Sequence, residues 1–256
     1  MRCLYREKIH ECGDYLEIDI FPVYKKAKSR GKKAKPTSEA QQKLNQKNAE
    51  RKIARLANTN FGRGDIRFDL TYNEKNKPKD AEDAQRQMQN FLRRVKYHRK
   101  KHGMPDLKYI AVTEFGEIKG RAHHHIIMNG GVSIADLADI WSKGYVTVKP
   151  LQFNEFGIED LAEYMIKSPT LYKRWNASKN LVQPKERQRD GRLSARRVKE
   201  LCNVANDARR EYEKLYEGYY FAGVRTFFND FNGGCYLSVQ MYRAKTLKKK
   251  VQRRTE

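Results

Sequence analysis

The chain has 256 residues, enough for one large domain with extensions, and its 54 Lys and Arg outnumber 31 Asp and Glu, a formal net charge of +23. Such an excess indicates a polyanionic partner, either nucleic acid or an anionic membrane. No apolar run approaches the roughly 20 residues that cross a bilayer, and the N-terminus lacks a signal-peptide core, so we expect nucleic acid and no membrane. Four scattered cysteines fit a reduced cytosol and exclude a disulfide framework or zinc knuckle.

The N-terminal third predicts a hairpin, a basic arm and a helix. Residues 4–23 alternate apolar and polar side chains, which is typical of a short hairpin or an edge strand. Lys25–Lys35 is a basic run without periodicity, either a solvated linker or an arm that binds phosphates. Residues 37–56 have helical spacing, and this basic helix could lie along DNA or pack on a core.

The middle of the chain predicts a regular succession of strands and helices. Asp65–Tyr72 alternates as a half-buried strand, and a helix opens at Asp80 and ends at Gly103. A hairpin follows, then a short helix with a capping box at Ser133, then a strand over Tyr145–Leu151. This order, strand–helix–strand–strand–helix–strand, is the ferredoxin-like α+β arrangement, an antiparallel sheet with helices on one face and the other face open.

The predicted hairpin carries three of the six histidines of the chain. A tip near residues 118–119 places Glu114 across from His123, and Val112 across from His125. Because strand side chains alternate between faces, Glu114, His123 and His125 converge on the open face, close enough to hold a divalent cation. For any single histidine, packing in a core is the ordinary alternative. The carboxylate and open water positions favour Mg²⁺ or Mn²⁺ over the zinc or nickel that imidazole alone suits.

Residues 120–128 (GRAHHHIIM) resemble the His-hydrophobic-His motif of the HUH endonucleases, specifically the rolling-circle replication initiators of phages and plasmids. The resemblance implies that His123 and His125 are metal ligands, with Glu114 the third. It also implies the same ferredoxin-like palm and a bacterial host cytoplasm. The middle position of the motif is usually hydrophobic and here is His124, which faces away from the expected site.

A short helix over residues 154–167 (NEFGIEDLAEYMIK) is expected after the last of these strands. Its Tyr164-x-x-Lys167 matches the nucleophile motif of the family, in the expected place downstream of the histidines. Relatives with two tyrosines often carry the first one four residues earlier, where this chain has Asp160, so it resembles a single-tyrosine enzyme. Tyr172 is the nearest alternative nucleophile in sequence.

The chemistry explains these residue types. A free phenol has a pKa of about 10 and is a weak nucleophile near neutrality. A bound cation would polarise the scissile phosphate, and Lys167 would add positive charge near the phosphate or the phenolate. Attack by Tyr164 would give a 5′-phosphotyrosyl link and free a 3′-OH that can prime synthesis.

The C-terminal quarter predicts a loop over residues 185–197, one long amphipathic helix over residues 198–216, and a strand over residues 235–242 that closes the edge of the sheet. The expected segments are residues 1–59 (hairpin, arm and helix), 60–181 (the endonuclease core) and 182–256 (a helix, a strand and a basic tail packing on the core).

Taken together, the sequence predicts a metal-dependent nickase and strand-joining enzyme that acts on single-stranded origin DNA. Because no Gly-x-x-x-x-Gly-Lys-Ser/Thr loop occurs, a host helicase is expected beside a host polymerase. An origin-binding or copy-control protein without nicking is the main alternative, and a cupin-like oxygenase would not explain the charge. Relaxases place their tyrosine before the histidines, and single-tyrosine transposases are shorter. The run over residues 175–181 (WNASKNL) also looks typical of phage and bacterial-element initiators.

Overall fold

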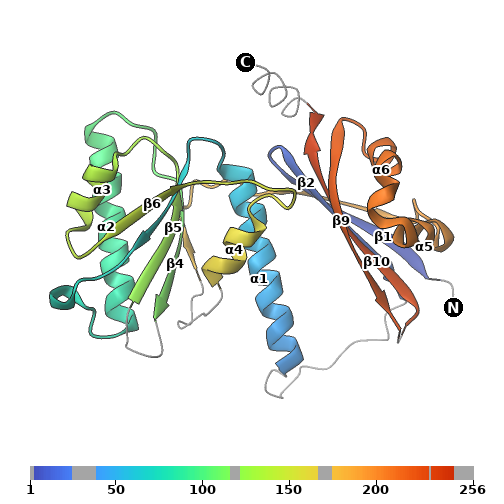
Figure 1. Ribbon diagram of the computed structural model, residues 1–256, viewed down its shortest axis with the longest axis horizontal. Helices are drawn as coiled ribbons and strands as arrows, with labels where there is room; N and C mark the ends of the chain where they lie inside the picture. The colour runs from blue at the N-terminus through green and yellow to red at the C-terminus, as the bar shows by residue number, and fades with distance from the viewer. Residues whose placement is uncertain (1–2, 25–38, 116–121, 167–174, 231, 245–256) are drawn as a thin grey trace. The chain divides into compact units, whose positions relative to one another are not determined.

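The computed structural model describes residues 3–24, 39–115, 122–166, 175–230 and 232–244 (Figure 1). The chain forms two compact α+β units, each built on a five-stranded antiparallel sheet. The terminal unit comprises residues 1–47, 154–157 and 183–256, and the central unit comprises residues 48–153 and 158–182. This division differs from the three consecutive segments expected from the sequence, because both ends of the chain contribute to one sheet. No helix in the described ranges is both long and apolar enough to cross a bilayer.

The central unit contains the strand–helix–strand–strand–helix–strand succession expected from the sequence. Its elements are the C-terminal part of α1 (Glu39–Asn60), β3 (Ile66–Leu70), a 3-10 turn (Glu74–Asn76), α2 (Ala81–Lys101), β4 (Tyr109–Phe115), β5 (Ala122–Met128), α3 (Ile134–Trp141), β6 (Val146–Pro150), α4 (Glu159–Ile166) and β7 (Asn176–Ala177). The strand order in the sheet is β6-β3-β5-β4-β7. The fifth strand, β7, was not predicted, because two residues are too few to show an alternating pattern.

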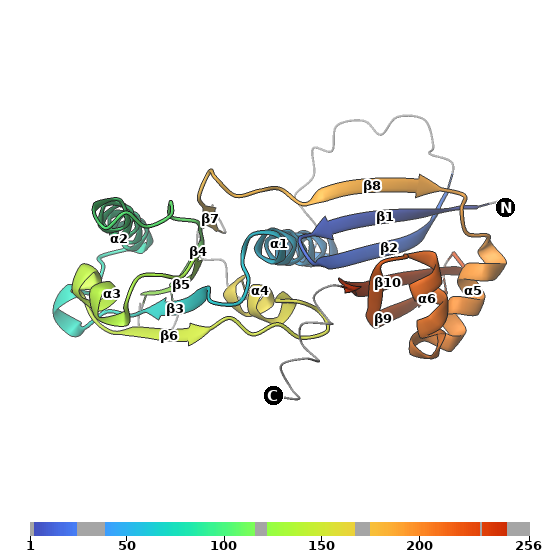
Figure 2. The ribbon, with the colours of Figure 1, turned by 90° about the horizontal axis from the view of Figure 1, so that it is seen from above.

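Helices α2 and α3 cover one face of this sheet (Figure 2). The Asp80 carboxylate caps α2 by accepting a hydrogen bond from the Asp83 amide at 2.7 Å, and the Ser133 hydroxyl caps α3 in the same way. The buried stripe of α2 recurs at helical spacing and meets the odd-numbered side of β4 and the even-numbered sides of β3 and β5. The largest members of this core are Phe68, Phe91, Ile126 and Trp141.

The opposite face is not fully open, which corrects the expectation from the sequence. Ile110, Val112 and Ile127 on this face pack into one core with Ile53 of α1 and Met165 of α4. The cause is the apolar stripe of α1, which has no other surface of the central unit to cover. The covered part of the face is apolar, and the polar side chains of β3, β4 and β5 follow it along the strands.

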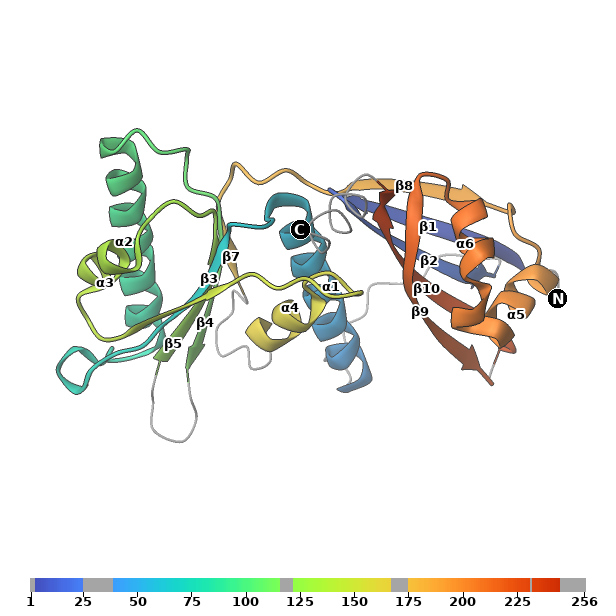
Figure 3. The ribbon, with the colours of Figure 1, turned by 45° about the horizontal axis from the view of Figure 1, so that its top comes forward.

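The terminal unit joins the two ends of the chain. Its elements are β1 (Leu4–Cys12), β2 (Tyr15–Val23), β8 (Lys185–Asp190), α5 (Ala195–Val204), a 3-10 turn (Ala205–Ala208), α6 (Arg209–Leu215), β9 (Tyr219–Asn229) and β10 (Gly234–Arg243). The predicted N-terminal hairpin is confirmed, and the sheet order is β8-β1-β2-β10-β9. Helices α5 and α6 cover one face of the sheet (Figure 3), where Ile18 pairs directly with Ile9 on one side and Val239 on the other.

Three C-terminal expectations are wrong. The strand expected over residues 235–242 pairs with β2 instead of closing the edge of the central sheet. Residues 185–190 form the edge strand β8, which every side chain leaves exposed, so no alternating pattern marks it. The single helix expected over residues 198–216 is interrupted at Ala205, whose φ of 44° lies in the left-handed region.

A short turn of the terminal unit stands directly before α4. The Tyr242 hydroxyl donates a hydrogen bond to the Asn154 carbonyl at 2.5 Å. The Arg225 guanidinium lies 4.1 Å from the centre of the Phe156 ring, within the range of a cation–π contact. The turn over residues 154–157 is therefore held by β9 and β10, and the chain re-enters the central unit at Ile158.

Candidate metal centre

The register of the histidine hairpin is the one predicted from the sequence. Glu114 and His123 are direct partners across β4 and β5, and so are Val112 and His125. Alternation along the two strands puts Glu114, His123 and His125 on the same face, as expected. The tip of the hairpin, residues 116–121, lies outside the described residues.

An aspartate that the sequence interpretation missed completes this cluster. Asp69 is the direct partner of His125 across β3 and β5, on the same face of the sheet. Its Oδ1 lies 2.6 Å from His125 Nδ1, and its other oxygen accepts from the Arg67 guanidinium at 3.1 Å. The available signal was an acidic residue on the polar side of the strand over residues 65–72, in a topology that places this strand beside the histidine strand.

The contacts of His125 determine which nitrogen faces the cluster. The side chain is 3% exposed, and its Nε2 lies 3.3 Å from Glu114 Oε2. Because a carboxylate oxygen only accepts, Nδ1 donates its proton to Asp69, and a neutral ring then presents a lone pair at Nε2. Two acceptors, Nε2 and the Glu114 oxygen, face each other at this distance. A positive charge between them, either a second proton or a metal cation, removes their repulsion.

Burial and charge act in opposite directions on Asp69. Burial alone would raise the pKa of the Asp69 carboxyl, but the hydrogen bond from His125 and the charge of Arg67 hold that pKa below its ordinary value. Asp69 is therefore ionised near neutrality and can orient His125 as an acceptor of its proton. Such carboxylate–histidine pairs commonly orient metal-binding imidazoles.

The donor set suits a hard divalent cation, but the described side chains do not form a closed metal site. Two ligands at right angles on Mg²⁺ lie about 3 Å apart, close to the observed spacing of His125 and Glu114. Within the described ranges, however, no three His, Cys, Asp or Glu side chains are arranged to hold a metal ion. The structure thus brings two of the three predicted ligands into contact and leaves His123 at its predicted register position.

His124 lies on the opposite face and has a packing role. Its Nε2 is 2.7 Å from the Tyr72 hydroxyl and its Nδ1 is 3.0 Å from the Thr113 hydroxyl, and the Trp141 ring meets it edge-on. Complete burial lowers the pKa of His124 to about 3. The imidazole is therefore neutral and fully bonded in the core under α2 and α3, away from the other two histidines.

A basic row borders the polar end of this face. Arg67 of β3 is the direct partner of Lys149 of β6, so their side chains lie on the same face of the sheet as Asp69. Lys149 is exposed, whereas Arg67 is bonded to Asp69. A phosphate that approached the cluster from this side would meet positive charge.

The predicted nucleophile helix is present as α4, although Tyr164 itself is described only by its backbone. Ile158 and Met165 are 1% and 2% exposed, and they anchor the helix against the same face of the sheet as His125. Asp160 lies exposed in the first turn. Lys167 and Tyr172 are outside the described residues, so the roles assigned to Tyr164 and Lys167 stay predictions.

Comparison with known proteins gives one finding. Residues 67–169 match the family model of the ORF2-type replication-associated proteins. No significant match was found among curated proteins or among solved structures. The matched range begins on β3, two residues before Asp69, and ends just beyond Lys167, so it includes every candidate site residue named above. The central part of this chain is therefore similar to replication-associated proteins, which supports a role in replication.

Proposed function

We propose that the protein is a rolling-circle replication initiator, a metal-dependent nickase and rejoining enzyme for single-stranded origin DNA. In this proposal the central unit is the ferredoxin-like palm of an HUH endonuclease. Support comes from the strand order, from the family match over residues 67–169 and from the formal charge of +23.

The observation that carries the proposal is the pair of acceptors formed by His125 Nε2 and Glu114 Oε2, 3.3 Å apart, with Asp69 fixed on the other ring nitrogen. A purely structural histidine is normally satisfied by donors and acceptors in alternation, as His124 is. His125 instead directs its second nitrogen at a carboxylate on the polar face. That arrangement favours a cation-binding role for His125.

Glu114, His123 and His125 would hold Mg²⁺ or Mn²⁺. When bound, the cation would polarise the scissile phosphate and stabilise the charge that develops on its oxygens. Asp69 would keep the proton of His125 on Nδ1, so that Nε2 stays available as a donor of electrons. Arg67 would keep Asp69 ionised, and Lys149 would attract the phosphate backbone.

Tyr164 would carry the covalent step. Its phenolic oxygen would attack the phosphorus in line, the bond from phosphorus to the 3′ oxygen would break, and the proton lost by the phenol would be balanced by one gained at the new 3′-OH. The product is a 5′-phosphotyrosyl ester. Since one phosphoester replaces another, the 3′-OH can reverse the step and rejoin a strand. Lys167 would stabilise the phenolate by its charge.

A covalent-adduct assay tests this proposal. Labelled single-stranded oligonucleotides that tile the parent replicon are incubated with the protein and Mn²⁺, then separated in denaturant. We expect one oligonucleotide to give an adduct that Tyr164→Phe abolishes and Tyr97→Phe, a control at an exposed tyrosine of α2, retains. An adduct formed by Tyr164→Phe at the wild-type rate would show that another tyrosine, such as Tyr172, is the nucleophile.

A second candidate is an origin-binding or copy-control protein without nicking. It is favoured by the lack of a three-ligand metal cluster among the described residues. The same assay separates the two candidates, because a binding-only protein would select an origin oligonucleotide by affinity and form no adduct with Mn²⁺. Substituting Ala for Glu114, His123 or His125 should remove the adduct and leave origin binding largely unchanged if the nickase proposal is correct.

A further inference from the structure

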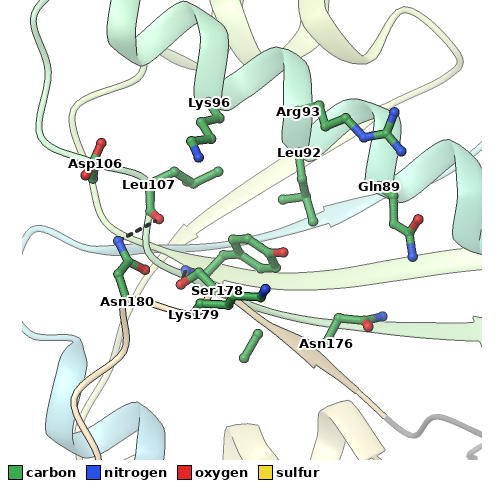
Figure 4. Close-up of a pocket in the computed structure, with 12 residues that line it drawn as sticks. Gln89, Leu92, Arg93, Lys96, Asp106, Leu107, Asn176, Ser178, Lys179 and Asn180 are labelled. Carbon is green, nitrogen blue, oxygen red and sulfur yellow. Dashed lines mark hydrogen bonds between the residues drawn. The ribbon is translucent and has the colours of Figure 1, made fainter.

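A second groove of the central unit lies on the opposite face of the sheet from the candidate metal centre. It runs between α2 and the segment that contains β7, and its volume is about 490 Å³ (Figure 4). Tyr109, which lines it, is on the face of β4 that meets α2, whereas Glu114 is on the other face. The groove is therefore separate from the cluster around His125.

The outer wall of the groove is held by bonds between side chains and main chain. The Ser178 hydroxyl accepts from the Tyr109 amide at 3.1 Å, and the Ser178 amide donates to the Tyr109 carbonyl at 3.0 Å. The Asn180 amide group donates to the Leu107 carbonyl at 3.3 Å. Two further bonds join Asn60 and Val182, each at 2.8 Å. These contacts fix residues 176–182 and give the groove a preformed shape.

The same segment supplies side chains that have no such structural role. Within the described part of the chain, neither Asn176 nor Lys179 makes a side-chain hydrogen bond or an ion pair. Both line the groove, and Lys179 is exposed. In the run over residues 175–181, Ser178 and Asn180 therefore account for the local fold, and Asn176 and Lys179 remain for a ligand.

The groove gathers positive charge. Arg93 and Lys96 of α2 line it together with Lys179, and all three are exposed. None of them is paired with a carboxylate in the ranges that the structure describes. Asp106 is the single acidic residue of the lining. Three cations with one anion in a concave surface favour an anionic ligand.

The rest of the lining suits a nucleobase. Tyr109 is half-buried and offers an aromatic ring beside the apolar side chain of Leu92. Figure 4 shows Gln89 and Asn176 at one end of the groove, where amide groups can bond the edge of a base. Aromatic rings, amides and unpaired cations in one groove are the combination by which proteins hold single-stranded nucleic acid.

We propose that this groove binds a segment of single-stranded DNA at a distance from the reacting phosphate, with the backbone on Arg93, Lys96 and Lys179 and a base near Tyr109 and Asn176. The proposal rests on the proposed function for the identity of the nucleic acid. A volume of about 490 Å³ matches a small-ligand site, the size of one or two nucleotide units, and does not admit a duplex. An unpaired strand also exposes the base edges that the amides would contact.

Fluorescence anisotropy with a short labelled oligothymidylate, in buffer with a chelator and no divalent metal, tests the groove without any nicking. Lys96→Glu combined with Lys179→Glu should weaken binding by about tenfold more than Arg94→Glu combined with Lys101→Glu. The control pair reverses two charges on exposed positions of α2 outside the groove. Replacing Lys96 and Lys179 by Arg should retain wild-type affinity.

Two further measurements make the outcome specific. Asn176→Ala should change the preference among oligo-dT, oligo-dA and oligo-dC and leave the salt dependence unchanged, because amides read bases and cations bind phosphates. Equal losses for the groove variant and the control pair would overturn the proposal. An equal loss of duplex binding would also overturn it, by showing a general phosphate surface. Absence of a covalent adduct in the wild type would refute the proposed nickase, while the anisotropy results would still decide the groove.

Discussion

Asp69 and His125 face each other directly across β3 and β5, with Oδ1 of the aspartate 2.6 Å from Nδ1 of the histidine. The pair joins two segments separated by more than fifty residues. It gives the candidate metal centre an orienting carboxylate, and its loss should affect metal binding more than folding.

Asp69→Asn should raise the Mn²⁺ concentration needed for half-maximal adduct formation by about 10- to 100-fold, because the amide no longer fixes the proton of His125 on Nδ1. Excess Mn²⁺ should restore most of the rate. A matched control is Thr147→Val, which changes the exposed partner of Asp69 on β6. A loss of rate that no Mn²⁺ concentration restores would contradict an orienting role.

The burial of His124 predicts loss of stability in acid. Its pKa is lowered to about 3 in the folded protein, so between that value and about 6.5 the unfolded chain binds one more proton than the folded one. Stability from this group is therefore complete above pH 6.5 and decreases as pH falls, by roughly 2 to 3 kcal/mol at pH 4.5.

Urea unfolding in chelator at several pH values measures this decrease. His124→Phe should be less stable at pH 7, because it loses the bonds to Tyr72 and Thr113, but its stability should depend less on pH in this range. His102→Gln, at the exposed end of α2, should keep the wild-type slope. Equal slopes for His124→Phe and wild type would contradict the assignment.

Gly144 is required by close packing of the backbone. A Cβ at this position would lie 2.2 Å from the Thr71 carbonyl oxygen and 2.8 Å from the Asn73 nitrogen, where no side chain can move aside. Gly144→Ala should destabilise the protein by about 1 to 3 kcal/mol in denaturant unfolding. Gly62→Ala is the control, because nothing lies within 4 Å of its added methyl group. A neutral Gly144→Ala would show that β3 and β6 tolerate displacement at this end.

The basic arm at Lys25–Lys35 lies outside the described residues, and its prediction depends on the sequence alone. Deleting it should weaken binding to every DNA sequence and reduce the slope of affinity against salt concentration, since phosphate contacts carry affinity without reading bases. Filter binding of origin and random oligonucleotides at several salt concentrations measures both effects. A selective loss of origin binding would instead make the arm a reader of bases.

Local signals accounted for the parts of the site that could be predicted. The partnership of Glu114 with His123 follows from a single tight hairpin, and the start of α2 follows from the capping carboxylate of Asp80. Neither depends on residues far away in sequence. The role of Asp69 depends on which strand lies beside β5, and it could be reached only by combining the sheet order with the alternation of β3.

Other features could not be read from sequence because their causes are distant or conformational. Strand β10 has the same alternation whether it borders one sheet or another, and only its fit to β2 decides. The apolar spacing on both sides of Ala205 continues across a left-handed residue that interrupts the helix. Strand β8 is exposed on every side chain, and its pairing with β1 depends on main-chain hydrogen bonds that no side-chain pattern encodes.

The pairing of β2 with β10 has a consequence for synthesis of the protein. The ribosome makes β2 early and completes β10 about two hundred residues later, a delay of roughly 10 to 40 s at ordinary elongation rates. During that time the apolar side chains of β2, such as Ile18 and Ile20, wait for Val239 and Leu237. The central sheet, from β3 to β7, emerges completely within the interval. The terminal sheet should therefore be the last part to fold, and a nascent chain arrested before residue 234 should expose an unpaired strand edge to chaperones.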